Sequence, residues 1–338
     1  MKTHRNLWDG FVSKDNFDLA LARAIRGKKS KPEVARFMKN AADNLERIRV
    51  DVAAGRFRTG QYRVFRISDP KPRDIYCLPF APDRIVHHAL VNILGPIWQS
   101  VFSRDSYACI PGRGLHDASK RASEFVRRNK YVLQCDILRF YPSIPHENAK
   151  RVIRRKIGDK RILAILDGII DSIGGGRNLP IGNYISQWLG NLYLNELDTF
   201  VKNVLRVRDY LRYSDDFCLF SDDKAQLAEW RDAVREFLDA RLLLGFSKAE
   251  IFPARCGLDF VGYRHFPKLV LLRKKTARRI RRRMDGIRAA CAKRRSGLPN
   301  ARETGQIAAA KGWLKHASAH NLVKKIGGDL FLLLARLG

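Results

Sequence analysis

The chain has 338 residues, of which 45% are hydrophobic, so it can bury the core of one large domain or of two to three subdomains, and wholesale disorder is excluded. Its formal net charge of +31 favours a polyanionic partner, nucleic acid before an anionic membrane. There is no apolar run long enough to span a bilayer, no signal peptide and no CxxC pair among the six cysteines. We therefore expect a cytoplasmic protein without a disulfide framework, zinc ribbon or membrane contact.

Hydrophobic periodicity predicts helices that alternate with strands along the chain. Helices are expected over residues 15–53, 84–98 (ended by Gly95-Pro96), 146–157, from there to about 173, 183–201 and 224–243, and through most of the chain from 268. Strands are expected in 60–80 (two, around a turn at Asp69-Pro70), over 131–137, in a hairpin over 211–220 and as a pair around 251–272. This alternation predicts an α/β or α+β body.

Two apolar strand patterns carry aspartates where side chains should be buried. Asp136 ends the strand 131–137, and Asp215 and Asp216 lie at the turn of the hairpin 211–220. Strands disfavour Asp and adjacent carboxylates repel, but a divalent cation makes both tolerable. If the hairpin lies beside the strand, three carboxylates surround one point, which suits two Mg²⁺ ions about 3.5–4 Å apart. The alternative is a solvated turn, where Asp is common.

Motifs around these aspartates resemble those of reverse transcriptases. YSDD within an apolar hairpin resembles their YxDD box, and CDILRFYPSI resembles their first catalytic strand, D-I-x-x-F-[FY]-x-S-I. Further blocks follow in the family's order: fingers blocks at 71–90 and 106–118, the helix packed on the nascent base pair at 179–198, the lysine-bearing loop and primer-grip hairpin at 246–266, and at 312–322 the thumb of group II intron-like bacterial enzymes. The resemblance covers roughly residues 60–325.

This resemblance implies an α+β right-hand polymerase fold with fingers, a palm built on a ferredoxin-like antiparallel sheet with helices, and a helical thumb. The implied domains are an N-terminal extension with fingers over 1–130, a palm over 131–267 with a fingers insertion at about 146–182, and a basic helical thumb over 268–338. The implied activity is that of an RNA-directed DNA polymerase acting on deoxynucleoside triphosphates, a template RNA and a cDNA or primer strand.

The resemblance also assigns roles to individual residues. Two Mg²⁺ ions, with Mn²⁺ as an alternative, would be held by Asp136, Asp215, Asp216 and the carbonyl of Ile137, and Lys248 would protonate the departing pyrophosphate. Lys71 and Arg73 would bind the triphosphate, unless they form a solvated basic turn. Tyr141 would lie beneath the sugar and exclude a 2′-hydroxyl, unless it is a core aromatic beside Phe140.

One block departs from the group II intron pattern Q-G-x-x-x-S-P. Residues 181–187 read I-G-N-Y-I-S-Q, with Ile181, Gly182, Ser186 and Gln187, and this resembles reverse transcriptases of diversity-generating retroelements. Such enzymes copy a template-repeat RNA and misincorporate opposite adenine. The implied partners are structured retroelement RNA and the accessory variability determinant, a small basic helical protein that forms a pentameric barrel.

Ile181, with Gly182 and Gln187, is expected against the nascent base pair. Isoleucine cannot make the hydrogen bond available to glutamine, so we expect Ile181, with Arg73 nearby, to relax base selection. Ile181 is otherwise a helix-entry hydrophobe. Two broader alternatives are another bacterial reverse transcriptase (retron, abortive-infection or CRISPR-linked) and a non-catalytic RNA-binding scaffold.

Residues 273–283 contain eight basic residues in eleven. Ala277, Ile280, Met284, Ile287 and Cys291 recur at spacings of three and four, which predicts a helix with one packed face. The other face would present cations to template–primer phosphates, unless the run is a disordered tail or localisation signal. The expected nucleic-acid-binding residues are Arg273, Lys274, Lys275, Arg278, Arg279, Arg281 and Arg282.

Overall fold

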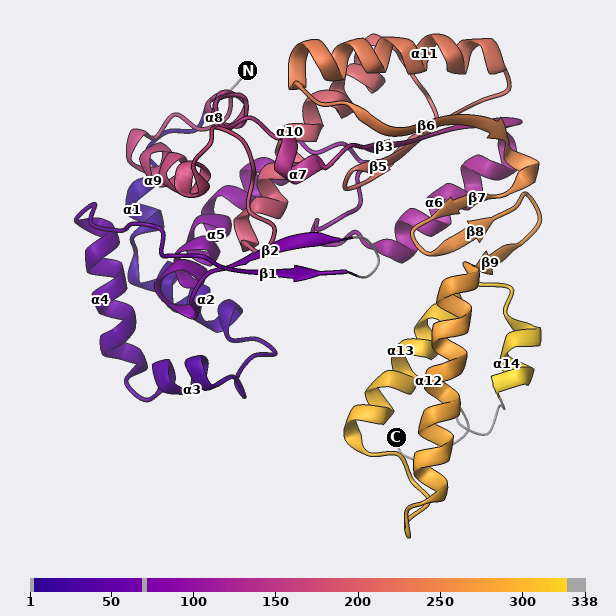
Figure 1. Cartoon of the computed structure of the whole chain (residues 1–338). Helices are drawn as coiled ribbons and strands as arrows, with labels where there is room; N and C mark the ends of the chain where they lie inside the picture. The colour runs from indigo at the N-terminus through magenta and orange to yellow at the C-terminus, as the bar shows by residue number, and fades with distance from the viewer. Residues whose placement is uncertain (1–2, 69–71, 327–338) are drawn as a thin grey trace.

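A four-stranded antiparallel sheet with the strand order β4-β5-β3-β6 lies at the centre of the computed structural model, which describes residues 3–68 and 72–326 (Figure 1). Its strands are β3 Tyr131–Ile137, β4 Tyr210–Tyr213, β5 Asp216–Ser221 and β6 Phe246–Pro253. Helices separate β3 from β4 and β5 from β6, so the chain follows the β-α-β-β-α-β order of ferredoxin-like folds. The predicted α+β class and antiparallel sheet are confirmed.

Both faces of this sheet are covered, which explains why its central strands are apolar throughout. Leu133 and Cys135 on β3 face a large core that contains Phe217 and Leu219 of β5. Val132, which precedes Leu133, faces a second core that contains Phe220. Because strand side chains alternate between faces, Asp136 lies on the side of the second core.

Helices and a second sheet supply the two cores. Buried residues of α5 (Ile85–Gln99), α10 (Tyr184–Thr199) and α11 (Lys224–Phe237) belong to the large core. The second core is formed with α6 (Leu115–Arg128) and the sheet of β7 (Leu258–Phe260), β8 (Tyr263–His265) and β9 (Val270–Leu272). Figure 1 shows α11 and α6 on opposite sides of the central sheet.

The N-terminal part contains the predicted helices and strand pair. The helices are α1 Trp8–Phe11, α2 Lys14–Ala24, α3 Pro32–Met38 and α4 Ala41–Ala53, and β1 Arg63–Ile67 pairs antiparallel with β2 Arg73–Cys77. The predicted turn at Asp69-Pro70 lies outside the described residues. Further along, α7 (Phe140–Ser143), α8 (His146–Arg154) and α9 (Lys160–Ile170) precede Gly174, Gly175 and Gly176, whose positive φ angles break the helix as predicted.

The predicted end of a helix at Gly95-Pro96 is wrong, because α5 continues through Pro96 to Gln99. A Cβ on Gly95 would lie 3.3 Å from the Trp188 side chain, so glycine lets α5 and α10 approach closely. Trp98, one turn later, is fully buried. Burial of this large side chain offsets the hydrogen bond lost at proline.

The C-terminal helices are α12 (Lys274–Ala292), α13 (Ala301–Lys315) and α14 (His320–Ile326). Ile280, Met284, Ile287 and Cys291 are buried in a third core, which confirms the predicted stripe except that Thr276 is buried and Ala277 only half-buried. All seven cations predicted to bind nucleic acid are exposed. In the described part of the chain no helix is long and apolar enough to cross a membrane, and the six cysteines are free.

A buried ion pair joins α10 to β4. The Arg212 guanidinium donates to the two carboxylate oxygens of Asp198 at 2.7 and 2.6 Å, and both side chains are 1% exposed. Tyr210 also donates to this carboxylate at 2.6 Å. Burial lowers the pKa of Arg212, but Asp198 outweighs burial and raises that pKa, so the guanidinium stays charged.

We expect Asp198→Ala to lower the free energy of unfolding by about 3–5 kcal/mol, because it leaves the Arg212 charge buried without its counter-ion. Thermal and urea unfolding would measure the change. The double variant Asp198→Leu with Arg212→Met should regain most of it, since an apolar pair needs no counter-charge. Asp18→Ala, which breaks an exposed pair with Lys14, is the matched control and should change the free energy of unfolding far less. Equal unfolding of Asp198→Ala and the unchanged protein would contradict the prediction.

Candidate active site

Four side chains lie in one row across the central sheet. Asp136 of β3 pairs directly with Asp216 of β5 on one side and with Lys248 of β6 on the other. Tyr213 of β4 pairs with Asp216 and completes the row, which we call the aspartate row. Directly paired residues of antiparallel strands project from the same face. The structure therefore brings Asp136 beside the aspartate hairpin, as predicted, although Asp216 is the first residue of β5 and not part of the turn.

The turn that carries Asp215 is held from two sides. Ser214 has the left-handed conformation, with φ of 60°. Its carbonyl accepts a hydrogen bond from Arg212 at 3.0 Å, and the Asp215 carbonyl accepts one from the Ile137 backbone N–H at 3.3 Å. These bonds place Asp215 beside the end of β3. The Ile137 carbonyl as a metal ligand stays a prediction.

Burial and mutual repulsion raise the pKa of two carboxyl groups of this cluster. Burial, with the charges of Asp136 and Asp215, raises the pKa of Asp216 to about 7, although a hydrogen bond from Gln134 lowers it. Burial likewise raises the pKa of Asp215, partly offset by the charge of Arg73. A cation at this point would therefore replace protons and relieve the repulsion.

The donor set fits a hard cation, but its geometry is not preformed. Within residues 3–68 and 72–326, no three His, Cys, Asp or Glu side chains are arranged as a metal site. The Asp136 carboxylate accepts a short hydrogen bond from the Ser247 hydroxyl of β6, on the side of β3 away from Asp216. Carboxylate oxygens are the ligands that Mg²⁺ prefers. Three half-buried carboxylates, two of them with a raised pKa, fit such an ion.

Lys248 lies on strand β6, so its predicted place in a loop is wrong. β6 forms a regular ladder with β3 up to a register shift at Asp136 and Ile137, and Lys248 stands just before that shift. Its ammonium donates to the Gln134 side-chain oxygen at 3.2 Å and lies 3.1 Å from the Glu250 carboxylate. Its role as a proton donor stays a prediction.

Gln134 is a site residue that the sequence patterns did not reveal. Its amide nitrogen donates to the Asp259 carbonyl of β7 at 2.9 Å and, at 3.5 Å, to Asp216. Its oxygen accepts from Lys248, so the amide joins one aspartate, the lysine and the second sheet. Gln134 lies two positions before Asp136 on a strand, so both side chains project from the same face. This spacing could have indicated that Gln134 belongs to the site.

The 181–187 block lies against the β1–β2 hairpin. The Tyr76 backbone N–H of β2 donates to the Ile181 carbonyl at 2.7 Å. Gly182 has φ of 125°, and a Cβ there would lie 2.3 Å from the Tyr76 carbonyl oxygen, so only glycine allows this approach. Arg73 starts β2 and is exposed, within electrostatic range of Asp215. Lys71 lies outside the described residues.

Tyr141 and Gln187 both lie at α10, Tyr141 against it and Gln187 in its first turn. Tyr141 is half-buried against Phe140, with ring centroids 4.9 Å apart, and against Gly190 of α10. Burial, and then Cys109 and Asp215, raise the pKa of Tyr141, whereas a hydrogen bond with Ser214, the residue before Asp215, lowers that pKa. Gln187 is exposed in the first turn of α10. The structure thus brings Tyr141 to the site, and its contact with a sugar stays a prediction.

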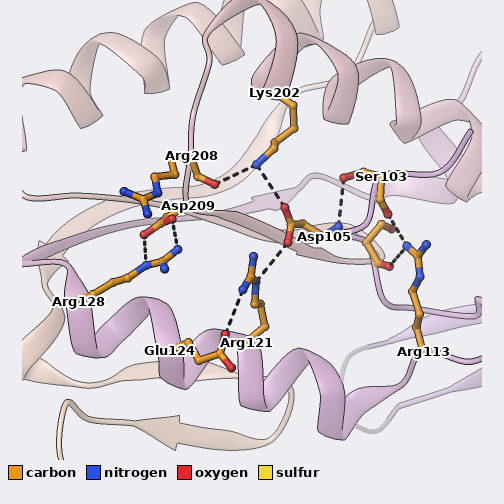
Figure 2. A network of polar contacts seen from close by, with 10 residues as sticks. Ser103, Asp105, Arg113, Arg121, Glu124, Arg128, Lys202, Arg208 and Asp209 are labelled. Atoms are coloured by element: carbon orange, nitrogen blue, oxygen red, sulfur yellow. Dashed lines mark hydrogen bonds and ion pairs between the residues drawn. The ribbon is translucent and has the colours of Figure 1, made fainter.

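A polar network behind β4 fixes the strand that leads into the turn (Figure 2). Asp105 accepts from Arg121 of α6 at 3.4 Å and lies 3.3 Å from the Lys202 ammonium, and Asp209 accepts from Arg128 at 2.6 Å. The Asp105 carbonyl accepts from the Arg212 backbone N–H at 2.8 Å, which covers the free edge of β4. These contacts join residues far apart in sequence, so periodicity gave no sign of them.

The basic face of α12 begins at this site. Arg273, just before the helix, lies 3.5 Å from the Asp259 carboxylate, and its charge lowers the pKa of Asp216, which burial and the other aspartates raise. The remaining predicted cations of α12 continue away from the site along an exposed helix face. The structure therefore places a mostly cationic helix face next to the aspartates, with Asp285 as an exposed acid that pairs with Arg281.

We expect Asp216→Asn to stabilise the metal-free protein at alkaline pH and to have little effect in acid. The folded-state pKa of Asp216, about 7, exceeds the value near 4 in unfolded chains. The carboxyl group of Asp216 therefore leaves the free energy of unfolding intact below pH about 4. That free energy falls as pH rises from about 4 through about 7, where the folded protein must lose the proton. Melting temperatures measured with a chelator across this range would test this, and a difference that is independent of pH would contradict it.

Gln134→Leu is the companion variant, because it removes the hydrogen bond that lowers the pKa of Asp216. The rise in melting temperature on adding Mg²⁺ should appear at higher pH in this variant, since the metal must displace the proton. Asp239→Asn changes an exposed aspartate in the helical turn after α11 and is the control. Its rise in melting temperature with Mg²⁺ should have the same pH dependence as that of the unchanged protein.

Comparison with known proteins places this site in a recognised family. The family described as "Reverse transcriptase (RNA-dependent DNA polymerase)" matches residues 69–265, more than half of the chain and all of the aspartate row. Protein YkfC of Escherichia coli (strain K12) is 27% identical, over 55% of this chain and 61% of YkfC.

Two further relatives carry names that refer to introns. The group II intron-encoded protein LtrA of Lactococcus lactis subsp. cremoris is 26% identical, over 37% of this chain and 22% of LtrA. Nuclear intron maturase 4, mitochondrial, of Arabidopsis thaliana is 22% identical, over 47% of this chain and 21% of the maturase. The chain thus spans less than two thirds of the length of each of these relatives.

Proposed function

The chain belongs to the reverse transcriptase (RNA-dependent DNA polymerase) family, and from this premise we propose that it copies an RNA template into DNA. Its substrates would be deoxynucleoside triphosphates and a primer or cDNA strand. The observation that carries the proposal is the row in which Asp216, Asp136 and Lys248 lie side by side, with Asp215 at the adjoining turn. A non-catalytic RNA-binding scaffold would have no use for half-buried carboxylates that repel one another.

Each residue of the site has a chemical task in this proposal. Asp136, Asp215 and Asp216 would hold two Mg²⁺ ions, or Mn²⁺, which when bound activate the 3′-hydroxyl and neutralise the leaving pyrophosphate. Arg73 binds the triphosphate through its planar guanidinium. Lys248 gives a proton to the pyrophosphate after leaving Gln134, and Tyr141 lies beneath the sugar.

The same proposal divides the chain into the parts of a right-handed polymerase. Residues 1–130 form the N-terminal extension and fingers, 131–267 the palm with a fingers insertion at about 146–182, and 268–338 the thumb. The exposed cations of α12 lie on the proposed thumb and begin at Arg273, beside the aspartate row. The template–primer would follow this face away from the site.

We expect Asp215→Asn to slow primer extension on an RNA template by roughly a thousandfold or more, because several kcal/mol of transition-state stabilisation is lost. Incorporation of deoxynucleotides by the purified protein measures this. Asp239→Asn is the control for an exposed aspartate and should extend normally. Absence of extension by the unchanged protein, or equal extension by Asp215→Asn, would contradict the proposed activity.

We further propose that the copying is error-prone, of the diversity-generating retroelement type. The template-repeat RNA would be copied with errors opposite adenine, with structured retroelement RNA and the accessory variability determinant pentamer as partners. The support is the 181–187 block: Ile181, held to Tyr76 at 2.7 Å, presents an apolar side chain where glutamine is usual. Another bacterial reverse transcriptase, of the retron, abortive-infection or CRISPR-linked type, is the alternative.

We expect Ile181→Gln to lower errors opposite template adenine by about tenfold, since an apolar contact discriminates by only about 1–3 kcal/mol and a buried polar contact by more. Sequencing of cDNA made by each variant measures the error spectrum. Ile181→Leu, which keeps the position apolar, should retain the errors. An unchanged spectrum in Ile181→Gln would refute the role of Ile181 and leave the polymerase proposal intact.

A further inference from the structure

Two adjoining hollows open on the side of the molecule that carries α6 and the end of α13. One, of about 350 Å³, lies between Ser123, Lys268 and Lys315. The other, of about 320 Å³, lies between Lys130, Tyr131 and Arg255. Arg127 and Pro267 line both, so the hollows form one continuous surface, which we call the α6–α13 surface.

The lining of this surface is cationic. Neither hollow has an aspartate or glutamate in its lining. The residues that carry a positive charge, or gain one on protonation, are all exposed: Arg127, Lys130, Arg255, Lys268, Lys315 and His316. In the described part of the chain, no carboxylate pairs with the five lysine and arginine side chains. Asp222 lies beside them but accepts from the Lys130 backbone N–H, at 2.8 Å.

Neighbouring arginines of α6 differ in whether a carboxylate pairs with them. Arg121 and Arg128 of α6 are paired with Asp105 and Asp209 in the network of Figure 2. Arg127, next to Arg128, points into the hollows and has no such partner in residues 3–68 and 72–326. The fold therefore neutralises the cations it needs for packing and leaves those of the α6–α13 surface available to an external anion.

This surface is remote from the aspartate row. Tyr131, which lines it, starts β3, whereas Asp136 lies near the other end of that strand. Five residues of extended strand span about 17 Å. A nucleic acid held at the α6–α13 surface is therefore not the base pair being formed at the aspartates.

We propose that the α6–α13 surface binds the phosphate backbone of a folded RNA segment that flanks the template. The inference rests on the proposed function, which supplies an RNA ligand, and extends it to a second contact. Phosphate contacts from lysine and arginine give affinity without reading sequence. Two contacts on one RNA raise the effective concentration of its template at the active site.

The chemistry favours RNA over an acidic protein. Protein interfaces have an apolar, often aromatic centre and few lysines. Here Lys130, Lys268 and Lys315 border hollows whose remaining lining combines Ser123 with apolar side chains such as Phe266. The three lysines, not the apolar residues, distinguish this surface from a protein interface. Lysine ammonium groups and serine hydroxyls donate to phosphate oxygens, and five cations match a backbone that carries one charge per nucleotide.

The experiment compares one charge-reversal triple variant, Arg127→Glu with Lys268→Glu and Lys315→Glu, against a matched triple, Lys29→Glu with Lys39→Glu and Lys224→Glu. The control residues are exposed cations on or beside other helices and change the net charge equally. Two probes are used: a long RNA whose hairpins flank a template segment, and the same template as a short primer–template without hairpins. Filter binding against salt concentration and primer extension are the readouts.

The surface variant should bind the hairpin RNA about tenfold or more weakly, with a salt dependence lower by roughly two to three ions, while the control changes far less. Extension of the short primer–template should be unchanged, and this arm alone reports on the polymerase activity. The glutamine versions of the three substitutions should show a smaller loss in the same direction, which excludes a folding defect.

Three results would overturn the proposal. Equal loss of RNA affinity in both triples would mean unspecific attraction by net charge. Equal loss on the short primer–template would mean that the surface belongs to the path of the copied duplex. Unchanged affinity for the hairpin RNA, including the case in which the surface captures an acidic protein instead, would mean that RNA does not bind there.

Discussion

The buried guanidinium of Arg212 is the contact on which the geometry of the site depends. It donates to Asp198 and Asn191 of α10 and to the Ser214 carbonyl of the turn. A charge out of water must keep its partners, because an unpaired buried ion costs several kcal/mol. Arg212 therefore fixes α10 relative to the turn. Since the 181–187 block leads directly into α10, and Asp215 follows Ser214, one side chain sets the distance between the aspartates and the block expected to touch the nascent base pair.

Strand register is the second constraint, and it acts on the carboxylates directly. Side chains alternate between two cores, so a slip of one residue between β3 and β5 would rotate Asp136 into the large core. Val132 and Leu133, buried on opposite sides, resist such a slip because each would exchange cores. The apolar residues around the aspartates thus hold the register that keeps three carboxylates on one face. Burial, and then the repulsion between these carboxylates, raises the pKa of Asp215 and Asp216.

Local patterns predicted the elements better than they predicted the contacts between them. The strand ending at Asp136 and the hairpin of Asp215 were readable because apolar runs and turn residues are properties of a few consecutive positions. The pairing of Asp136 with Asp216 needed the motif resemblance, because register depends on residues far apart in the chain. Gln134 was missed because a lone polar residue in a strand does not reveal its partners. Proline predicts the end of a helix at residue 96, but α5 continues past Pro96 because packing against Trp188 outweighs this local effect.

The excess positive charge is divided among three environments. Arg121 and Arg128 are neutralised inside the fold, α12 carries an exposed cationic face that begins at Arg273, and Arg127 belongs to the α6–α13 surface. The exposed cations of α12 and of the α6–α13 surface repel one another in the free protein. A bound polyanion would reduce this electrostatic repulsion. Anything that binds the folded chain alone also stabilises it by mass action. A chain with a net charge of +31 should therefore be more stable when a polyanion covers both exposed surfaces.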